Sequence, residues 1–199
     1  MKKIFQFLVL TSLIFACSDS TDFWGNETPE PLNGETNEDE NARRNGRDKP
    51  VMVTVPFKAD FLGEYQSVEP DESCELPQFV RVIVDFEGNG THLGKFTGNF
   101  SFCVDQESNY GPSDSYMVAA NGDILYVSIE GQVIGGREDD HPEYVDSYWR
   151  DPFVILGGTG RFEGATGSGM SDDYNSSEDP YSHHHWEGTI TMKKGKDNL

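Results

Sequence analysis

The stretch VILGGTGRFEGATG, residues 154–167, joins an apolar run to a cluster of glycines. Such a stretch could be a phosphate-binding loop, but a dinucleotide-binding fold requires a helix directly after its glycines. The residues that follow, FEGATGSGMSDDYNSS, consist largely of glycines and weak helix formers, and no lysine follows at the spacing of a Walker-type loop. The sequence therefore argues against nucleotide binding and favours a tight turn between two strands.

In such a turn the glycines have a mechanical role. Gly157, Gly158 and Gly160 allow positive φ angles in a turn with a bulge. The later glycines, from Gly164 onward, let the next strand bend or lie close to another backbone. We therefore predict that Gly157, Gly158, Gly160 and Gly164 are structural turn residues and bind no ligand.

The rest of the domain reads as strands. VRVIVDFE (80–87) and KFTGNFSFCV (95–104) alternate apolar and polar residues, and Asn-Gly pairs at 89–90 and 121–122 lie between strand-like runs. No stretch has a convincing helical period. The predicted strands are 53–66, 78–88, 91–104, 114–120, 123–133, 147–157, 160–171 and 183–193. Eight antiparallel strands with one apolar face close naturally, so we predict an all-β, eight-stranded antiparallel closed barrel of calycin or lipocalin shape.

The N-terminus indicates export. A short positive region precedes an apolar core that ends in LIFAC (13–17), which resembles the lipobox of bacterial lipoproteins. The resemblance implies that residues 1–16 are a signal peptide and that Cys17 carries a fatty acyl chain such as palmitate. SDSTD (18–22) resembles the signal that sends some lipoproteins to the outer face of the outer membrane. We therefore expect a lipid-anchored outer-membrane protein facing the cell surface.

Composition divides the mature chain in two. The segment 17–50 contains the lipidated Cys17 and few apolar residues, so it is predicted to be a disordered acidic tether, and 51–199 forms one domain. A formal net charge of −20 excludes nucleic acid as a partner. The expected partners are the lipid bilayer, through Cys17, and a small apolar ligand; the sequence identifies no partner protein.

The three cysteines are expected to have two different roles. If Cys17 is lipidated, Cys74 and Cys103 remain, and an even remainder in an exported protein predicts one disulfide.

Three segments resemble a known family in order and spacing. They are GNGTHLGKFTGNF (88–100), AANGDILYV (119–127) and GGTGRFEGATGSG (157–169), and they resemble the bacterial allene oxide cyclase/dirigent-like barrel family over residues 55–193. The resemblance implies an eight-stranded barrel with a central cavity, in which plant members catalyse or steer cyclisation and coupling. No position matches a catalytic motif, so no catalytic residue is carried over.

The run HHH (183–185) has two interpretations. Strand alternation places His184 inside with Trp186, and His183 and His185 outside. The outer pair could share a metal ion or simply form a solvated strand edge, and we predict no metal and no cofactor. The acidic segments 138–143 and 171–179 lack the calcium-loop pattern and are predicted to be solvated loops.

The predicted interior is apolar. Only His184, and Glu130 if Tyr126 also faces inward, could act as an acid or base there, which weakens an enzymatic interpretation. We predict that the barrel binds a small apolar or aromatic ligand. The alternatives are an interaction protein with a filled barrel, or a cyclase or isomerase acting in the cavity. The predicted ligand-lining residues are Phe57, Phe61, Phe86, Phe100, Tyr126, His184 and Trp186.

Overall fold

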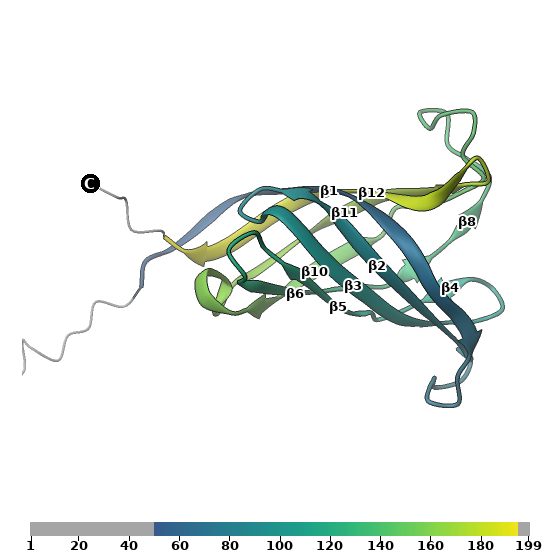
Figure 1. Ribbon diagram of the computed structural model, residues 1–199, viewed down its shortest axis with the longest axis horizontal. Helices are drawn as coiled ribbons and strands as arrows, with labels where there is room; N and C mark the ends of the chain where they lie inside the picture. Colours follow the sequence, from purple (N-terminus) through teal and green to yellow (C-terminus); the bar gives the residue numbers. More distant parts are fainter. Residues whose placement is uncertain (1–49, 195–199) are drawn as a thin grey trace, which may run out of the picture. The chain divides into compact units, whose positions relative to one another are not determined.

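The computed structural model describes residues 50–194, which form a closed antiparallel barrel (Figure 1). Its eight main strands are β1 (Met52–Pro70), β2 (Val80–Gly90), β3 (Gly94–Val104), β5 (Asp114–Val118), β6 (Ile124–Ile129), β10 (Pro152–Gly158), β11 (Thr166–Ser176) and β12 (Asp179–Lys193). They lie in the order β10-β6-β5-β3-β2-β1-β12-β11, and β10 pairs with β11 to close the ring. The predicted fold class is confirmed.

The two ends of the barrel differ. The turn end has the short connections 91–93, 119–123 and 159–165, together with the start of β1 and the end of β12, which pair there. The loop end has the longer connections 71–79, 105–113 and 130–151, and Figure 1 shows β4 and β8 at this end. Four short strands belong to these loops: β4 (Asn109–Tyr110), β7 (Gly131–Gln132), β8 (Ile134–Gly135) and β9 (Ser147–Trp149).

The turn-end half of the interior is packed with side chains. Phe57, Phe153 and Trp186 are fully buried there, and the rings of Phe153 and Trp186 stack with centroids 4.5 Å apart. Each large apolar side chain buried in this way contributes about 1.5–3 kcal/mol relative to exposure. Strand alternation produces this core, because every second residue of β1 and β12 points inward.

The glycine-rich stretch closes the turn end. Gly157 lies at a register shift between β10 and β6 with φ +123°, and Gly160 begins the single-turn 3-10 segment η1 (Gly160–Phe162) with φ +55°. Phe162 is fully buried and contributes to the packed core. The predicted strand 160–171 therefore begins too early, because residues 159–165 form the turn that places Phe162 inside.

Gly158 has a different role from the one expected. Its φ angle is not positive, but a Cβ atom at this position would lie 2.0 Å from the carbonyl oxygen of Ile124 on β6. Close approach of two backbones, and not positive φ, is what requires glycine here.

Two other sequence expectations need correction. The Asn89-Gly90 pair belongs to the β2–β3 ladder, and the turn follows at residues 91–93, whereas Asn121-Gly122 does form the β5–β6 turn. The acidic segment 171–179 is not a solvated loop, because residues 171–176 complete β11 and Asp173 is fully buried.

The signal peptide, the lipidation of Cys17 and the tether lie outside the described residues. Within residues 50–194 no helix is long and apolar enough to cross a membrane.

Candidate functional site

The loop-end half of the barrel interior contains a cavity of about 230 Å³. Its walls are mostly aromatic and aliphatic, so it offers an apolar surface to a ligand. The apolar lining residues include Val82, Val84, Phe100, Phe102, Trp149 and Trp186. Phe100 and Trp186 project from β3 and β12, whereas Trp149 comes from the short strand β9 in the long loop.

Three polar residues of β11 and β12 line the same cavity: Asp173, Ser182 and His184. Asp173 is paired with His184 across the ladder and is fully buried. Its Oδ2 accepts a hydrogen bond from Trp186 Nε1 at 3.1 Å, and its Oδ1 accepts one from the backbone N–H of His185 at 3.1 Å. These two bonds offset part of the cost of burying a carboxylate.

Only one of the two ring nitrogens of His184 has a hydrogen-bond partner. Its Nε2 lies 2.8 Å from Ser182 Oγ, and the Ser182 hydroxyl donates to the Gly63 carbonyl oxygen at 3.3 Å. Because that hydroxyl has a single proton, His184 Nε2 acts as the donor to Ser182. His184 Nδ1 lies 3.3 Å from Asp173 Oδ2 without a hydrogen bond, and it is the one buried side-chain polar atom without a hydrogen-bond partner in residues 50–194.

The three side chains do not form a nucleophilic triad, although a serine, a histidine and an aspartate lie together. The Ser182 proton is directed to Gly63, away from His184. A triad also needs N–H donors aimed at a developing oxyanion, but the backbone around Ser182 belongs to the β1–β12 ladder. This arrangement can recognise a polar group or exchange a proton, and it is not built for acyl transfer.

A second polar pair includes Tyr110, which also lines the cavity. The Tyr110 hydroxyl donates to Asp151 Oδ2 at 2.9 Å, and burial raises the pKa of Tyr110 above its ordinary value. Burial also raises the pKa of the Asp151 carboxyl. Tyr110 therefore stays protonated at neutral pH and keeps its hydroxyl directed at Asp151.

Some of the predicted ligand-lining residues border the cavity and others do not. Phe100, His184 and Trp186 do line the cavity. Phe61 lies behind it, with its ring stacked on His184 at 4.5 Å.

The remaining candidates line no part of this cavity. Phe57 and Phe86 face inward but belong to the packed core. The prediction that Tyr126 lines the interior is wrong: its side chain is 43% exposed on the outer face, because Leu125 and Val127 take the inner positions of β6. Glu130 is also exposed.

Sequence reasoning misses the central residue of the site. It places Asp173 in a solvated acidic loop because the segment MSDDYNS (170–176) has polar residues at both parities. A usable signal is its position two residues after Ser171 and four after Gly169, which continues the inward parity of the strand. Trp149 cannot be predicted as a cavity residue from the sequence, because its strand β9 has only three residues and shows no alternation.

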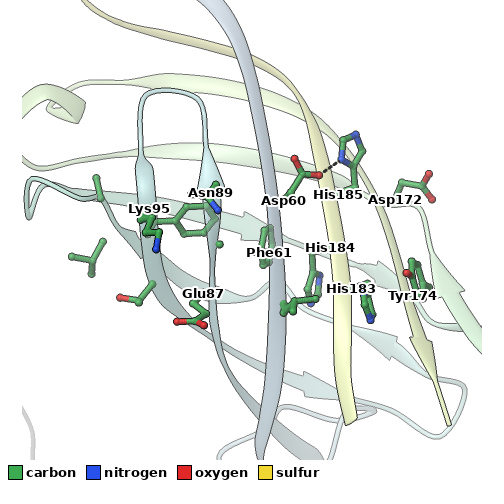
Figure 2. Close-up of a pocket in the computed structure, with 16 residues that line it drawn as sticks. Asp60, Phe61, Glu87, Asn89, Lys95, Asp172, Tyr174, His183, His184 and His185 are labelled. Carbon is green, nitrogen blue, oxygen red and sulfur yellow. Dashed lines mark hydrogen bonds and ion pairs between the residues drawn. The ribbon is translucent and has the colours of Figure 1, made fainter. Parts of the chain in front are cut away.

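The outer histidines of the HHH run bind carboxylates. His183 Nε2 lies 2.9 Å from Asp179 Oδ2, and His185 Nε2 lies 3.2 Å from Glu187 Oε1. Figure 2 shows the contact of His185 with Asp60. The hydrogen bond to Asp60 is the main cause that raises the pKa of His185. Across residues 50–194 no group of three or more histidine, cysteine or acidic residues is arranged to hold a metal ion.

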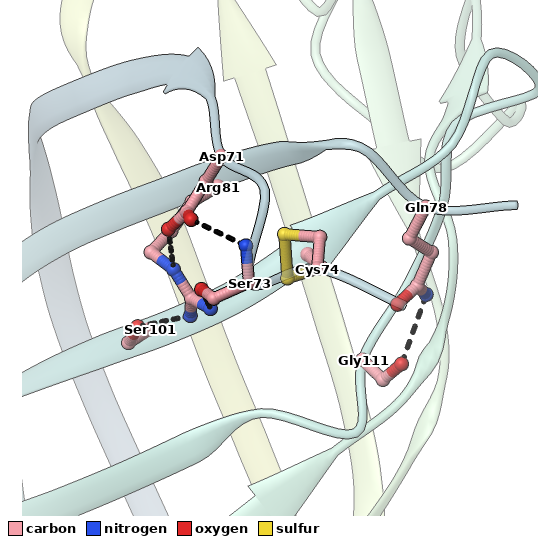
Figure 3. Close-up of a disulfide and its surroundings, with 8 residues drawn as sticks. Asp71, Ser73, Cys74, Gln78, Arg81, Ser101 and Gly111 are labelled. Carbon is pink, nitrogen blue, oxygen red and sulfur yellow. Dashed lines mark hydrogen bonds and ion pairs between the residues drawn. A yellow bond between two sulfur atoms is a disulfide. The ribbon is translucent and has the colours of Figure 1, made fainter. Parts of the chain in front are cut away.

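The disulfide lies at the loop end, next to the cavity. Cys74 and Cys103 are bonded with their Cα atoms 5.8 Å apart, which confirms the predicted pair (Figure 3). Arg81 adds a second link to the 71–79 loop by donating to Asp71 and Ser73. Hydrogen bonds from the Ser73 backbone and from Arg81 lower the pKa of Asp71 to about 2. The 71–79 loop is therefore fixed to β2 and β3 beside the cavity-lining Val104.

Comparisons with known proteins give fold similarity only. No family model and no curated protein matches the sequence. Among solved structures, the pterocarpan synthase dirigent protein PsPTS1 has a TM-score of 0.45 and 15% identity, covering 73% of this chain and 97% of its own. The pterocarpan synthase dirigent protein GePTS1 has a TM-score of 0.45 and 16% identity, covering 76% of this chain and 92% of its own. A conserved protein of unknown function from Rhodopseudomonas palustris has a TM-score of 0.40 and 12% identity, covering 72% of this chain and 99% of its own. Each of these proteins is similar to the chain in structure at low sequence identity.

Proposed function

We propose that the barrel binds a small single-ring aromatic ligand with one hydrogen-bond donor in the loop-end cavity. The observation that carries this proposal is His184 Nδ1, a buried atom without a hydrogen bond in a cavity whose walls are mostly apolar. An apolar cavity of about 150 Å³ accepts benzene, whereas drug-sized ligands occupy about 300–1,000 Å³. The cavity of about 230 Å³ lies between these sizes, so it suits one ring with a small substituent.

The hydrogen-bond pattern selects the ligand's polar group. With Nε2 donating to Ser182, a neutral His184 presents a lone pair at Nδ1, and Asp173 Oδ2 lies 3.3 Å away. Two neighbouring acceptors favour a ligand that brings a proton, such as a phenol hydroxyl or an amine. An aromatic ring would pack between Phe100 and Trp149, which also line the cavity.

Calorimetric titration with 4-methylphenol and toluene tests this proposal. We expect wild type to bind 4-methylphenol about tenfold more tightly than toluene, because only the phenol offers a hydrogen bond to His184. Val82→Phe fills the cavity and should abolish both, whereas Thr189→Ala on the outer face should change neither. Equal affinity for the two probes, or binding that survives Val82→Phe, contradicts the proposal.

A cyclase or isomerase activity is a second candidate, which one observation favours. Asp173 and His184 lie together inside the cavity, where an acid–base pair could move a proton on a bound substrate. The test is proton exchange at carbon: a bound ketone incubated in deuterated water should gain deuterium at the carbon next to its carbonyl faster with wild type than with Asp173→Asn. A completely filled barrel is the less favoured alternative, since only the turn-end half is packed.

The membrane anchor is a separate proposal that rests on the sequence. LIFAC and the residues after it support acylation of Cys17 and location in the bacterial outer membrane. Metabolic labelling with an alkynyl palmitate should mark wild type and leave Cys17→Ser unlabelled. An unlabelled wild-type chain in the same bacterial host contradicts the anchor.

A further inference from the structure

A second concave site, of about 740 Å³, lies on the outer face of the barrel (Figure 2). Two rows of outward side chains border it, and both rows cross the strands from β11 to β3. Residues paired in the ladders form the first row: Tyr174, His183, Leu62, Glu87 and Thr97. The second row, two residues away along each strand, is Asp172, His185, Asp60, Asn89 and Lys95. We call this site the outer groove.

The outer groove is long and crosses the strands. Val118 on β5 continues the first row beyond Thr97, so the groove spans six neighbouring strands. At about 4.8 Å between neighbouring strands, its length is about 24 Å. A site of this length fits several units of an extended chain better than one compact molecule.

The floor of the groove offers little to a peptide. It consists of the β11–β12–β1–β2–β3 ladders, whose backbone N–H and C=O groups bond to each other. Peptides that bind sheets usually add a strand at a free edge, and a closed barrel has none among its eight main strands. Recognition in the outer groove therefore depends on side chains.

Unpaired polar side chains line one end of the groove. Glu87 and Thr97 lie opposite each other, as do Asn89 and Lys95, and within residues 50–194 none of the four side chains has a hydrogen bond or an ion pair. Glu87 can only accept hydrogen bonds, Lys95 can only donate them, and Thr97 and Asn89 can do both. A matching ligand both donates and accepts at closely spaced positions, as a row of hydroxyl groups does.

At the other end of the groove, an aromatic and aliphatic row lies beside the charged row of Asp172, His185 and Asp60. The rings of Tyr174 and His183 stack with centroids 4.6 Å apart, and Leu62 lies beside them, 42% exposed. Flat rings and an aliphatic side chain pack against C–H groups. The ligand therefore combines hydroxyls with apolar C–H faces along its length.

From this chemistry we propose that the outer groove binds a neutral linear oligosaccharide. A chain of sugar rings carries hydroxyls at its edges and C–H groups on its faces, and it matches an extended groove. Polyanionic chains are disfavoured, because the groove contains Asp60, Glu87 and Asp172 and the whole chain has a net charge of −20. This site is distinct from the cavity inside the barrel and does not depend on the cavity's ligand.

Affinity electrophoresis of the full chain tests the proposal. The probes are gels containing laminarin, galactomannan, hydroxyethyl cellulose or dextran, with polygalacturonate as the anionic control. We expect at least one neutral polysaccharide to retard wild type. Asn89→Ala and Lys95→Ala should each weaken that retardation by about tenfold, the effect of losing one hydrogen bond.

Matched variants separate the outer groove from the inner cavity and from the rest of the outer face. Thr189→Ala and Ser168→Ala lie on the outer face outside the groove and should be retarded like wild type. Val82→Phe, which fills the inner cavity, should also be retarded like wild type. The proposal is overturned if no neutral polysaccharide retards wild type, if the groove variants behave like wild type, or if only polygalacturonate causes retardation.

Discussion

Asp173 and His184 face each other across the β11–β12 ladder inside the barrel, with Oδ2 and Nδ1 3.3 Å apart. Asp173 is satisfied by N–H groups of Trp186 and His185, whereas His184 Nδ1 has no hydrogen bond. A packing core gains nothing from this asymmetry, because an unpaired buried polar atom costs free energy. A ligand that pairs with Nδ1 would remove that cost.

Replacing Asp173 should destabilise the fold. Each carboxylate oxygen accepts one N–H, and Asp173→Asn keeps a single acceptor oxygen, so one buried donor loses its partner. We expect the free energy of unfolding to fall by about 1–3 kcal/mol in urea denaturation. Asp114→Asn, at an exposed position of β5, is the control and should change it by less than about 0.5 kcal/mol. Identical unfolding of Asp173→Asn and wild type contradicts the burial described here.

The disulfide should contribute strongly to stability. Cys74 and Cys103 are separated by 29 residues in the sequence, and closing a loop of that size stabilises by about 3–4 kcal/mol in the chain-entropy model. The Cys74→Ala/Cys103→Ala variant should therefore unfold at a clearly lower urea concentration. If wild type is equally stable with and without reductant, the bond has no such effect.

The glycine-rich turn can be probed with single methyl groups. Gly158→Ala places Cβ 2.0 Å from the Ile124 carbonyl oxygen and should cost about 1–3 kcal/mol. Gly164→Ala has open space but φ +70°, so it should cost about 1–2 kcal/mol. Gly135→Ala has neither constraint and serves as the control in the same thermal unfolding series. A Gly158 variant as stable as the control would contradict the close β10–β6 approach.

His185 should titrate above an ordinary histidine. The hydrogen bond to Asp60 is the largest cause of its raised pKa, followed by the contact with Glu187. A pKa raised in the folded state stabilises the fold below about pH 6.5, and this contribution is lost as pH rises through the folded value. In NMR titration, Asp60→Asn should lower the His185 midpoint. An unchanged midpoint would show that Asp60 is not its partner in solution.

The barrel could be predicted from the sequence because its core strands alternate cleanly, as in β2 and β3. The cavity could not, because its key residues break that pattern. Asp173 is polar at an inward position. Trp149 and Tyr110 come from strands too short to show any period. The packed half follows the local sequence rules for strands, and the half with the cavity departs from them.

The measurement that bears most directly on the loop-end cavity is a crystal structure of the protein soaked with 4-methylphenol. The proposed function predicts an ordered ring between Phe100 and Trp149, with its hydroxyl within about 3.2 Å of His184 Nδ1. Density for the ring on the outer surface alone, with the interior closed by side chains, would contradict it.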